Sequence, residues 1–220
     1  MVILLGSAFL VSWRRGFAYF AMLALCATMT AFTFSYVGTD AQNYHFPMQY
    51  LLRHGWNSIF DSTVEKFTAI AGDAQLSICH TLFLPKFSSL CGAISASAFG
   101  VFSGDGFLGY VLIGCLLLSS AKFAKRYWAA NRLLCFVFAA GLTFSTKITS
   151  FLVGQVDYST YASFCIAALS LVLYVRERKI GDLAVFFASG CVCMSSKSTG
   201  VLCFFVLVVM TLPLLLRRIE

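Results

Sequence analysis

Residues 14–57 read RRGFAYFAMLALCATMTAFTFSYVGTDAQNYHFPMQYLLRHGWN, and the rest of the chain is interpreted from this stretch. Two arginines precede an apolar run at residues 17–37, which is long enough for a transmembrane helix. A polar and aromatic segment follows the run directly. Because Lys and Arg favour the cytoplasmic side of a membrane, Arg14 and Arg15 place the start of the run there and Asp40 on the opposite side.

The composition of the whole chain is that of a membrane protein. Hydrophobic residues make up 60% of the 220 residues and charged residues 11%, with a mean hydropathy of +0.85. A soluble chain carries about 25% charged residues. The apolar runs are continuous, whereas an outer-membrane barrel needs alternating polar and apolar residues. We therefore predict an all-α, polytopic transmembrane helical bundle that forms a single module over residues 1–220.

The basic residues report the topology of this bundle. The formal net charge is +7, and 11 of the 16 Lys and Arg residues lie in short clusters between apolar runs. Such clustering is typical of cytoplasmic loops. No basic face interleaved with aromatic residues is found in the sequence, so we expect no nucleic-acid partner. The clusters are Arg14 and Arg15; Lys122, Lys125, Arg126 and Arg132; Arg176, Arg178 and Lys179; and Arg217 and Arg218.

Residues 82–102 are long enough to span the membrane but are rich in Ser and Gly, and the basic residues decide their placement. If the segment does not span, 11 cations lie inside and 5 outside; if it spans, the counts become 4 and 12. We therefore expect a long first external loop at residues 38–106 that contains interfacial helices. About six spans result, since five further spans fill residues 107–216. These five are expected near residues 106–121, 133–146, 158–175, 180–195 and 200–216.

The first interfacial helix is expected at residues 47–54. Proline suits the first turn of a helix, and Gly55 is suited to end it. Met48, Leu51 and Leu52 would form an apolar face that could lie on the membrane surface.

Two acids are the first candidates for chemistry. An ionisable residue at a membrane boundary is a candidate for a functional role, and Asp40 is predicted to lie at such a boundary. The predicted topology delivers Asp157 to the same external side. The two carboxylates could form one site, in which one acts as a general base or either helps to bind a divalent cation. The alternatives are a solvated loop acid or local cap at Asp40 and a helix cap at Asp157.

Three further residues could contact a substrate. His45 could orient or donate to a phosphate, or could simply be an interfacial histidine. Tyr44 fits an aromatic belt better than a substrate contact. Lys86 could pair with a lipid phosphate or extend to the interface. Because the sequence holds no Gly-rich nucleotide-binding loop, we expect no nucleotide cofactor.

The order of these motifs resembles the first external loop and later spans of the GT-C membrane glycosyltransferases, in particular the group similar to protein mannosyltransferases and aminoarabinose transferases. The resemblance lies in an acid after the first span and in four short motifs that follow it. The motifs are NYHFP at residues 43–47, LPKF at residues 84–87, GQVD at residues 154–157 and SKSTG at residues 196–200.

This resemblance implies a role for each candidate residue. Asp40 would be the catalytic acid residue that deprotonates the acceptor hydroxyl or amine, and Asp157 would orient the substrate or a metal ion. Lys86 would contact the carrier phosphate, while Tyr44 and His45 would line the donor pocket. The donor would be a polyprenyl-phosphate-linked sugar within the membrane lipids. The site would face the periplasmic or luminal side, most simply of a bacterial inner membrane.

Two other classes of protein stay open from the sequence. A transporter or lipid-carrier flippase would carry ionisable residues near the middle of several spans, and the spans here have almost no internal charge. GT-C enzymes usually continue for several more spans than this chain has. A truncated, non-catalytic membrane protein is therefore the second alternative.

Overall fold

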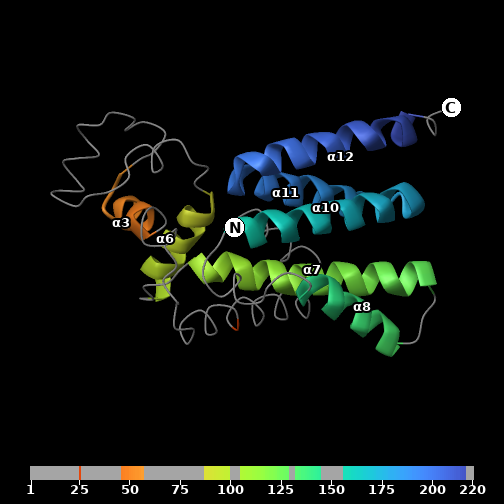
Figure 1. The fold of residues 1–220 in the computed structure, drawn as a ribbon, viewed down its shortest axis with the longest axis horizontal. Helices are drawn as coiled ribbons and strands as arrows, with labels where there is room; N and C mark the ends of the chain where they lie inside the picture. The colour runs from red at the N-terminus through yellow and green to blue at the C-terminus, as the bar shows by residue number, and fades with distance from the viewer. Residues whose placement is uncertain are drawn as a thin grey trace.

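The computed structural model describes residues 25, 46–56, 87–99, 105–128, 132–144 and 156–216. Every regular element within these ranges is a helix, and no strand occurs among them (Figure 1). In chain order the helices are α3 (Phe46–Arg53), α6 (Phe87–Phe99), α7 (Asp105–Trp128), α8 (Arg132–Phe144), α10 (Val156–Glu177), α11 (Ile180–Ser196) and α12 (Ser198–Leu216).

Two long helices, α7 and α10, form the centre of the described structure and run in the same direction (Figure 1). Leu108, Leu112 and Leu116 recur every four residues along α7 and pack against Tyr158 and neighbouring residues of α10. A spacing of four places side chains on one face of a helix, so this face becomes the buried seam. The charge pattern predicts the same relative direction, since it places the ends of both segments on the cytoplasmic side.

The chain then folds back twice, so that α11 runs antiparallel to α10 and α12 runs antiparallel to α11 (Figure 1). Leu171 of α10, Phe186 of α11 and Phe204 of α12 are at most 7% exposed and pack together. The rings of Phe186 and Phe204 have centroids 5.1 Å apart, a separation typical of stabilising aromatic pairs. The shorter helix α8 packs along α7.

Helices α3 and α6 lie together at the end of the bundle where α7 and α10 begin (Figure 1). The end of α3 is determined by glycine. Gly55 has a φ of +87°, and the N–H of Trp56 donates to the carbonyl of Leu51 at 3.0 Å. This hydrogen bond across a left-handed residue is the Schellman motif. The predicted short helix and its stop at Gly55 are confirmed.

The apolar face of α3 has a different role from the one predicted. Met48 and Leu51 are 1% and 0% exposed, and α3 packs against α6. The expectation that this face lies on the membrane surface is therefore wrong for these two side chains. Small residues of α6, including Ser89 and Ala93, are also buried and allow the close approach.

Two helices carry apolar stretches long enough to cross a membrane, judged by length and composition: Leu108–Tyr127 in α7 and Tyr158–Glu177 in α10. Two shorter apolar stretches are found at Ile180–Ser196 and Ser198–Pro213. Helix α6 has 13 residues, and the residues on either side of it lie outside the described ranges. That residues 82–102 do not span the membrane therefore stays a prediction.

The predicted boundaries differ most at α7. The sequence predicts a span at residues 106–121, but the helix continues to Trp128 through three cations. Of the predicted first span, at residues 17–37, the structure describes only Leu25, which is helical and exposed.

Candidate functional site

Four of the five predicted site residues lie outside the described residues: Asp40, Tyr44, His45 and Lys86. Asp157 is the second residue of α10, but its side chain is also outside the described part of the structure. Their proposed roles therefore stay predictions.

The helices next to these residues in the sequence nevertheless lie at one end of the molecule. Helix α3 begins one residue after His45, α6 begins one residue after Lys86, and α10 begins one residue before Asp157. Helix α3 packs against α6, and α6 packs against α7 and α11 (Figure 1). We call this region the α3–α6 end; it consists of α3, α6, the first turns of α7 and α10, and the link between α11 and α12 at Lys197.

Several hydroxyl groups at the α3–α6 end are already used within their own helices. Ser163 is fully buried, and its Oγ donates to the carbonyl of Thr160 at 3.1 Å. Ser196 is 2% exposed and donates to the carbonyl of Val192 at 2.7 Å. These hydroxyls satisfy local backbone carbonyls, so they have a structural role.

Two buried polar groups at this end have no such partner. Gln49 of α3 and Ser95 of α6 are 3% and 2% exposed. Neither Nε2 of Gln49 nor Oγ of Ser95 has a hydrogen-bond partner among the described residues. An unsatisfied buried polar group costs about 1–3 kcal/mol, so such groups are candidates for contact with water or a bound molecule. Gln49 was missed from the sequence, although it is a polar residue within the otherwise apolar helix FPMQYLLR.

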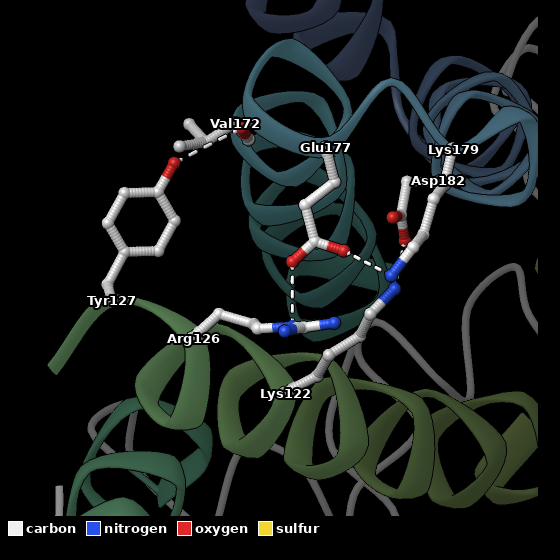
Figure 2. Close-up of polar contacts among 7 residues, drawn as sticks. All are labelled: Lys122, Arg126, Tyr127, Val172, Glu177, Lys179 and Asp182. Carbon is white, nitrogen blue, oxygen red and sulfur yellow. Dashed lines mark hydrogen bonds and ion pairs between the residues drawn. The ribbon is translucent and has the colours of Figure 1, made fainter. Parts of the chain in front are cut away.

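A second polar cluster lies at the opposite end of the bundle and is shown in Figure 2. We call it the basic end; it extends from Lys122 to the end of α7 and includes the α10–α11 turn as far as Asp182. Nε of Arg126 lies 2.8 Å from one carboxylate oxygen of Glu177, and Nζ of Lys179 lies 2.6 Å from the other. Lys122 pairs with Asp182.

Aromatic contacts add to these ion pairs. The hydroxyl of Tyr127 donates to the carbonyl of Val172 at 3.3 Å (Figure 2). The guanidinium carbon of Arg176 lies 4.4 Å from the centre of the Tyr127 ring, within cation–π distance. Tyr127 of α7 therefore contacts α10 twice, through its hydroxyl and through its ring, and both contacts hold the two helices together.

Asp182 is the most buried carboxylate of the basic end. It is 5% exposed and lies in the first turn of α11, where the helix dipole favours a negative charge. One of its oxygens, Oδ2, has no hydrogen-bond partner among the described residues. Glu177 and Asp182 were not selected from the sequence. The cations beside them were explained as markers of the cytoplasmic side, so the acids among them were not considered as their partners. The available signal was the presence of Glu177 and Asp182 within or just after a basic cluster.

The arrangement of the basic end supports binding of an anion more than catalysis. Both carboxylates are paired with cations, so neither is positioned as a general base. No group of three or more His, Cys, Asp or Glu residues that could hold a metal ion occurs in the described ranges.

Comparisons of the chain with protein-family models, curated proteins and solved structures found no match.

Proposed function

We propose that this chain is a multi-pass integral-membrane glycosyltransferase of the GT-C type, or its N-terminal catalytic module. It would transfer a sugar from a polyprenyl-phosphate carrier to an acceptor on the periplasmic or luminal face, most simply at a bacterial inner membrane. The proposal has two parts, a membrane-spanning bundle of about six helices and a transfer site at the α3–α6 end.

The exposed side chains support the membrane part. Large apolar residues are exposed on four helices, with exposed fractions of 58% for Leu118, 60% for Leu134, 54% for Phe187 and 65% for Leu202. Lipid tails are as apolar as these side chains, so contact with lipid would cover them at little cost. The two span-length stretches in α7 and α10 fit the same environment.

The observation that carries the transfer part is the meeting of α3, α6 and the start of α10 at one end of the bundle. These are the helices that adjoin the motifs of the GT-C resemblance. The site would lie at the membrane boundary, where a water-soluble acceptor and a lipid-linked donor can both reach it.

In the proposed reaction the carboxylate of Asp40 takes the proton from the acceptor hydroxyl or amine. The acceptor atom then bonds to the anomeric carbon of the sugar, and the bond from that carbon to the phosphate oxygen breaks. Polyprenyl phosphate leaves with the bonding electrons, and Lys86 would balance its charge. Asp157 would orient the substrate or, together with Asp40, hold a divalent cation, while Tyr44 and His45 would line the donor pocket.

The test is the Asp40→Asn variant, assayed in lipid nanodiscs with a panel of radiolabelled polyprenyl-phosphate sugars and an envelope extract as the source of acceptor. We expect transfer by the wild-type chain and a loss of at least about 100-fold in the variant, since a general base contributes about 10²–10⁴-fold. The matched control is Asp61→Asn, an acid of the same predicted external loop, which should retain transfer. Unchanged transfer by a membrane-inserted Asp40→Asn protein would refute the assignment.

The transporter alternative fits the described helices less well. In these helices the charged residues lie within about two turns of a helix end, and the middle of each helix is uncharged. Transporters that bind ions or polar substrates place such groups near the bilayer midplane.

A further inference from the structure

The basic end carries more positive charge than its acids neutralise. It contains six cationic side chains and two carboxylates, an excess of four positive charges. The side chains of Lys122, Arg126 and Lys179, which form the ion pairs, are themselves 44%, 52% and 53% exposed. The six cations are Lys122, Lys125, Arg126, Arg176, Arg178 and Lys179.

The two carboxylates fix the positions of some cations and leave others available. Glu177 holds Arg126 and Lys179, and Asp182 holds Lys122. No carboxylate among the described residues pairs with Lys125, Arg176 or Arg178, and all three are exposed. These three side chains can therefore neutralise an external anion without breaking an internal pair.

Tyrosine rings position two of the three available cations. The guanidinium carbon of Arg176 lies 4.4 Å from the centre of the Tyr127 ring, and that of Arg178 lies 5.6 Å from the centre of the Tyr174 ring. A cation–π contact restrains the guanidinium but leaves its charge uncompensated. Tyrosine also favours the level of lipid headgroups, because one end of its side chain is apolar and the other polar.

The apolar surface next to the basic end indicates the kind of anion. Leu118 of α7 and Val172 of α10 are 58% and 43% exposed, and each lies within about two turns of the cations of its own helix. A ligand that covers both surfaces must join an acyl chain to a negatively charged head. We propose that the basic end binds the headgroups of anionic phospholipids, with the acyl chains lying along α7 and α10.

This inference rests on the membrane part of the proposed function and is independent of sugar transfer. An anionic leaflet attracts cations near its surface with about 1 kcal/mol per Lys or Arg, which corresponds to a factor of about five in affinity for each charge. The three available cations together are therefore expected to change the affinity at least tenfold.

The test uses purified protein in a neutral detergent, titrated with phosphatidylglycerol or phosphatidylcholine. Binding is read by native mass spectrometry and by the shift in Tm. We expect tighter binding of phosphatidylglycerol by the wild-type protein. The triple variant Lys125→Gln, Arg176→Gln, Arg178→Gln should lose at least about tenfold of that affinity while phosphatidylcholine binding stays unchanged.

Two controls make the result specific. The variant Arg53→Gln removes an exposed cation at the α3–α6 end and should bind phosphatidylglycerol as the wild type does. A charge-conserving variant with Arg176→Lys and Arg178→Lys should retain most of the binding, which separates loss of charge from loss of fold. The Asp40→Asn variant should also bind the lipid normally, so a failure of the transferase assignment can be told apart from a failure of this one.

Three outcomes would overturn the inference. The first is equal affinity of the wild-type protein for the two lipids. The second is undiminished phosphatidylglycerol binding by a triple variant that still unfolds cooperatively. The third is a Tm shift with inorganic phosphate that matches the shift with phosphatidylglycerol, because the site would then recognise phosphate without the acyl chains.

Discussion

Gly200 is the residue at which a single added methyl group would disturb the described fold most directly. A Cβ atom at this position would overlap the backbone carbonyl of Cys193, where α11 and α12 approach each other. Backbone atoms cannot rotate away as a side chain can, so the helices themselves would have to separate. Sγ of Cys193 lies 3.6 Å from the carbonyl oxygens of both Thr160 and Gly200, so its single S–H can donate to either one, and three helices meet at this point.

We predict that Gly200→Ala lowers the free energy of unfolding by about 1–3 kcal/mol, the range for overpacked interiors. The measurement is thermal or denaturant unfolding of the detergent-solubilised protein. Gly181→Ala in α11 is the matched control, because no atom lies within 4 Å of the place its new Cβ would occupy and alanine favours a helix by about 0.5–1 kcal/mol. Equal stabilities of the two variants would contradict the close helix approach.

Among single residues, the sequence predicts features that depend on near neighbours in the chain and does not predict contacts between distant residues. Gly55 could be recognised as a helix stop because the requirement for a left-handed residue is local, and the structure has it there. The pairing of Lys122 with Asp182 could not be recognised, because 60 residues separate the partners and no local pattern records which helices become neighbours.

Between elements, the ion pairs of the basic end explain why α7 is longer than the sequence predicts. The predicted span ends at residue 121, before the first cation of the cluster, since charges usually mark the end of an apolar run. The helix continues because Lys122 and Arg126 lie one turn apart on one face and meet Asp182 and Glu177 across the interface. A helical spacing of four residues matches this contact, whereas a loop would not hold Lys122 and Arg126 on one face toward the two acids.

We predict a measurable coupling between α7 and α11 through the pair of Lys122 and Asp182. In a double-mutant cycle with Lys122→Gln and Asp182→Asn, the coupling energy is expected to be about 0.5–1 kcal/mol, because Lys122 is partly exposed and solvent screens the pair. Unfolding of the four proteins at low and high salt provides the measurement, and the coupling should decrease at high salt. Additive effects of the two substitutions at low salt would show that the pair does not link the helices in solution.

Across the described part of the molecule, the all-helical class and the order of the helices were predictable, but the candidate site was not. Continuous apolar runs predict helices, and the structure has α8, α10, α11 and α12 within two residues of the predicted bounds at each end. The apolar face of α3 shows the limit, because the same pattern suits a membrane surface and a helix neighbour such as α6. The predicted site depends on residues from distant segments, and the described residues include only the backbone of Asp157.

The opposite placement of the α3–α6 end and the basic end leads to a prediction about topology. If α7 and α10 cross the membrane in the same direction, the two ends lie on opposite sides of it. Variants with Arg53→Cys and with Lys125→Cys place a thiol at each exposed position. In right-side-out vesicles a membrane-impermeant maleimide should modify the protein at position 53 and reach position 125 only after permeabilisation, with each labelled peptide identified by mass spectrometry.

Native Cys203 provides an internal control, because it is exposed on α12 among apolar residues. Lipid covering this face would protect its thiol from the reagent before and after permeabilisation, and full labelling is expected only once detergent removes the lipid. Rapid labelling of Cys203 in intact vesicles would mean that α12 faces water. Labelling of positions 53 and 125 from the same side would mean that α7 and α10 do not cross the membrane as proposed, and the lipid-binding and transferase proposals would both lose their common premise.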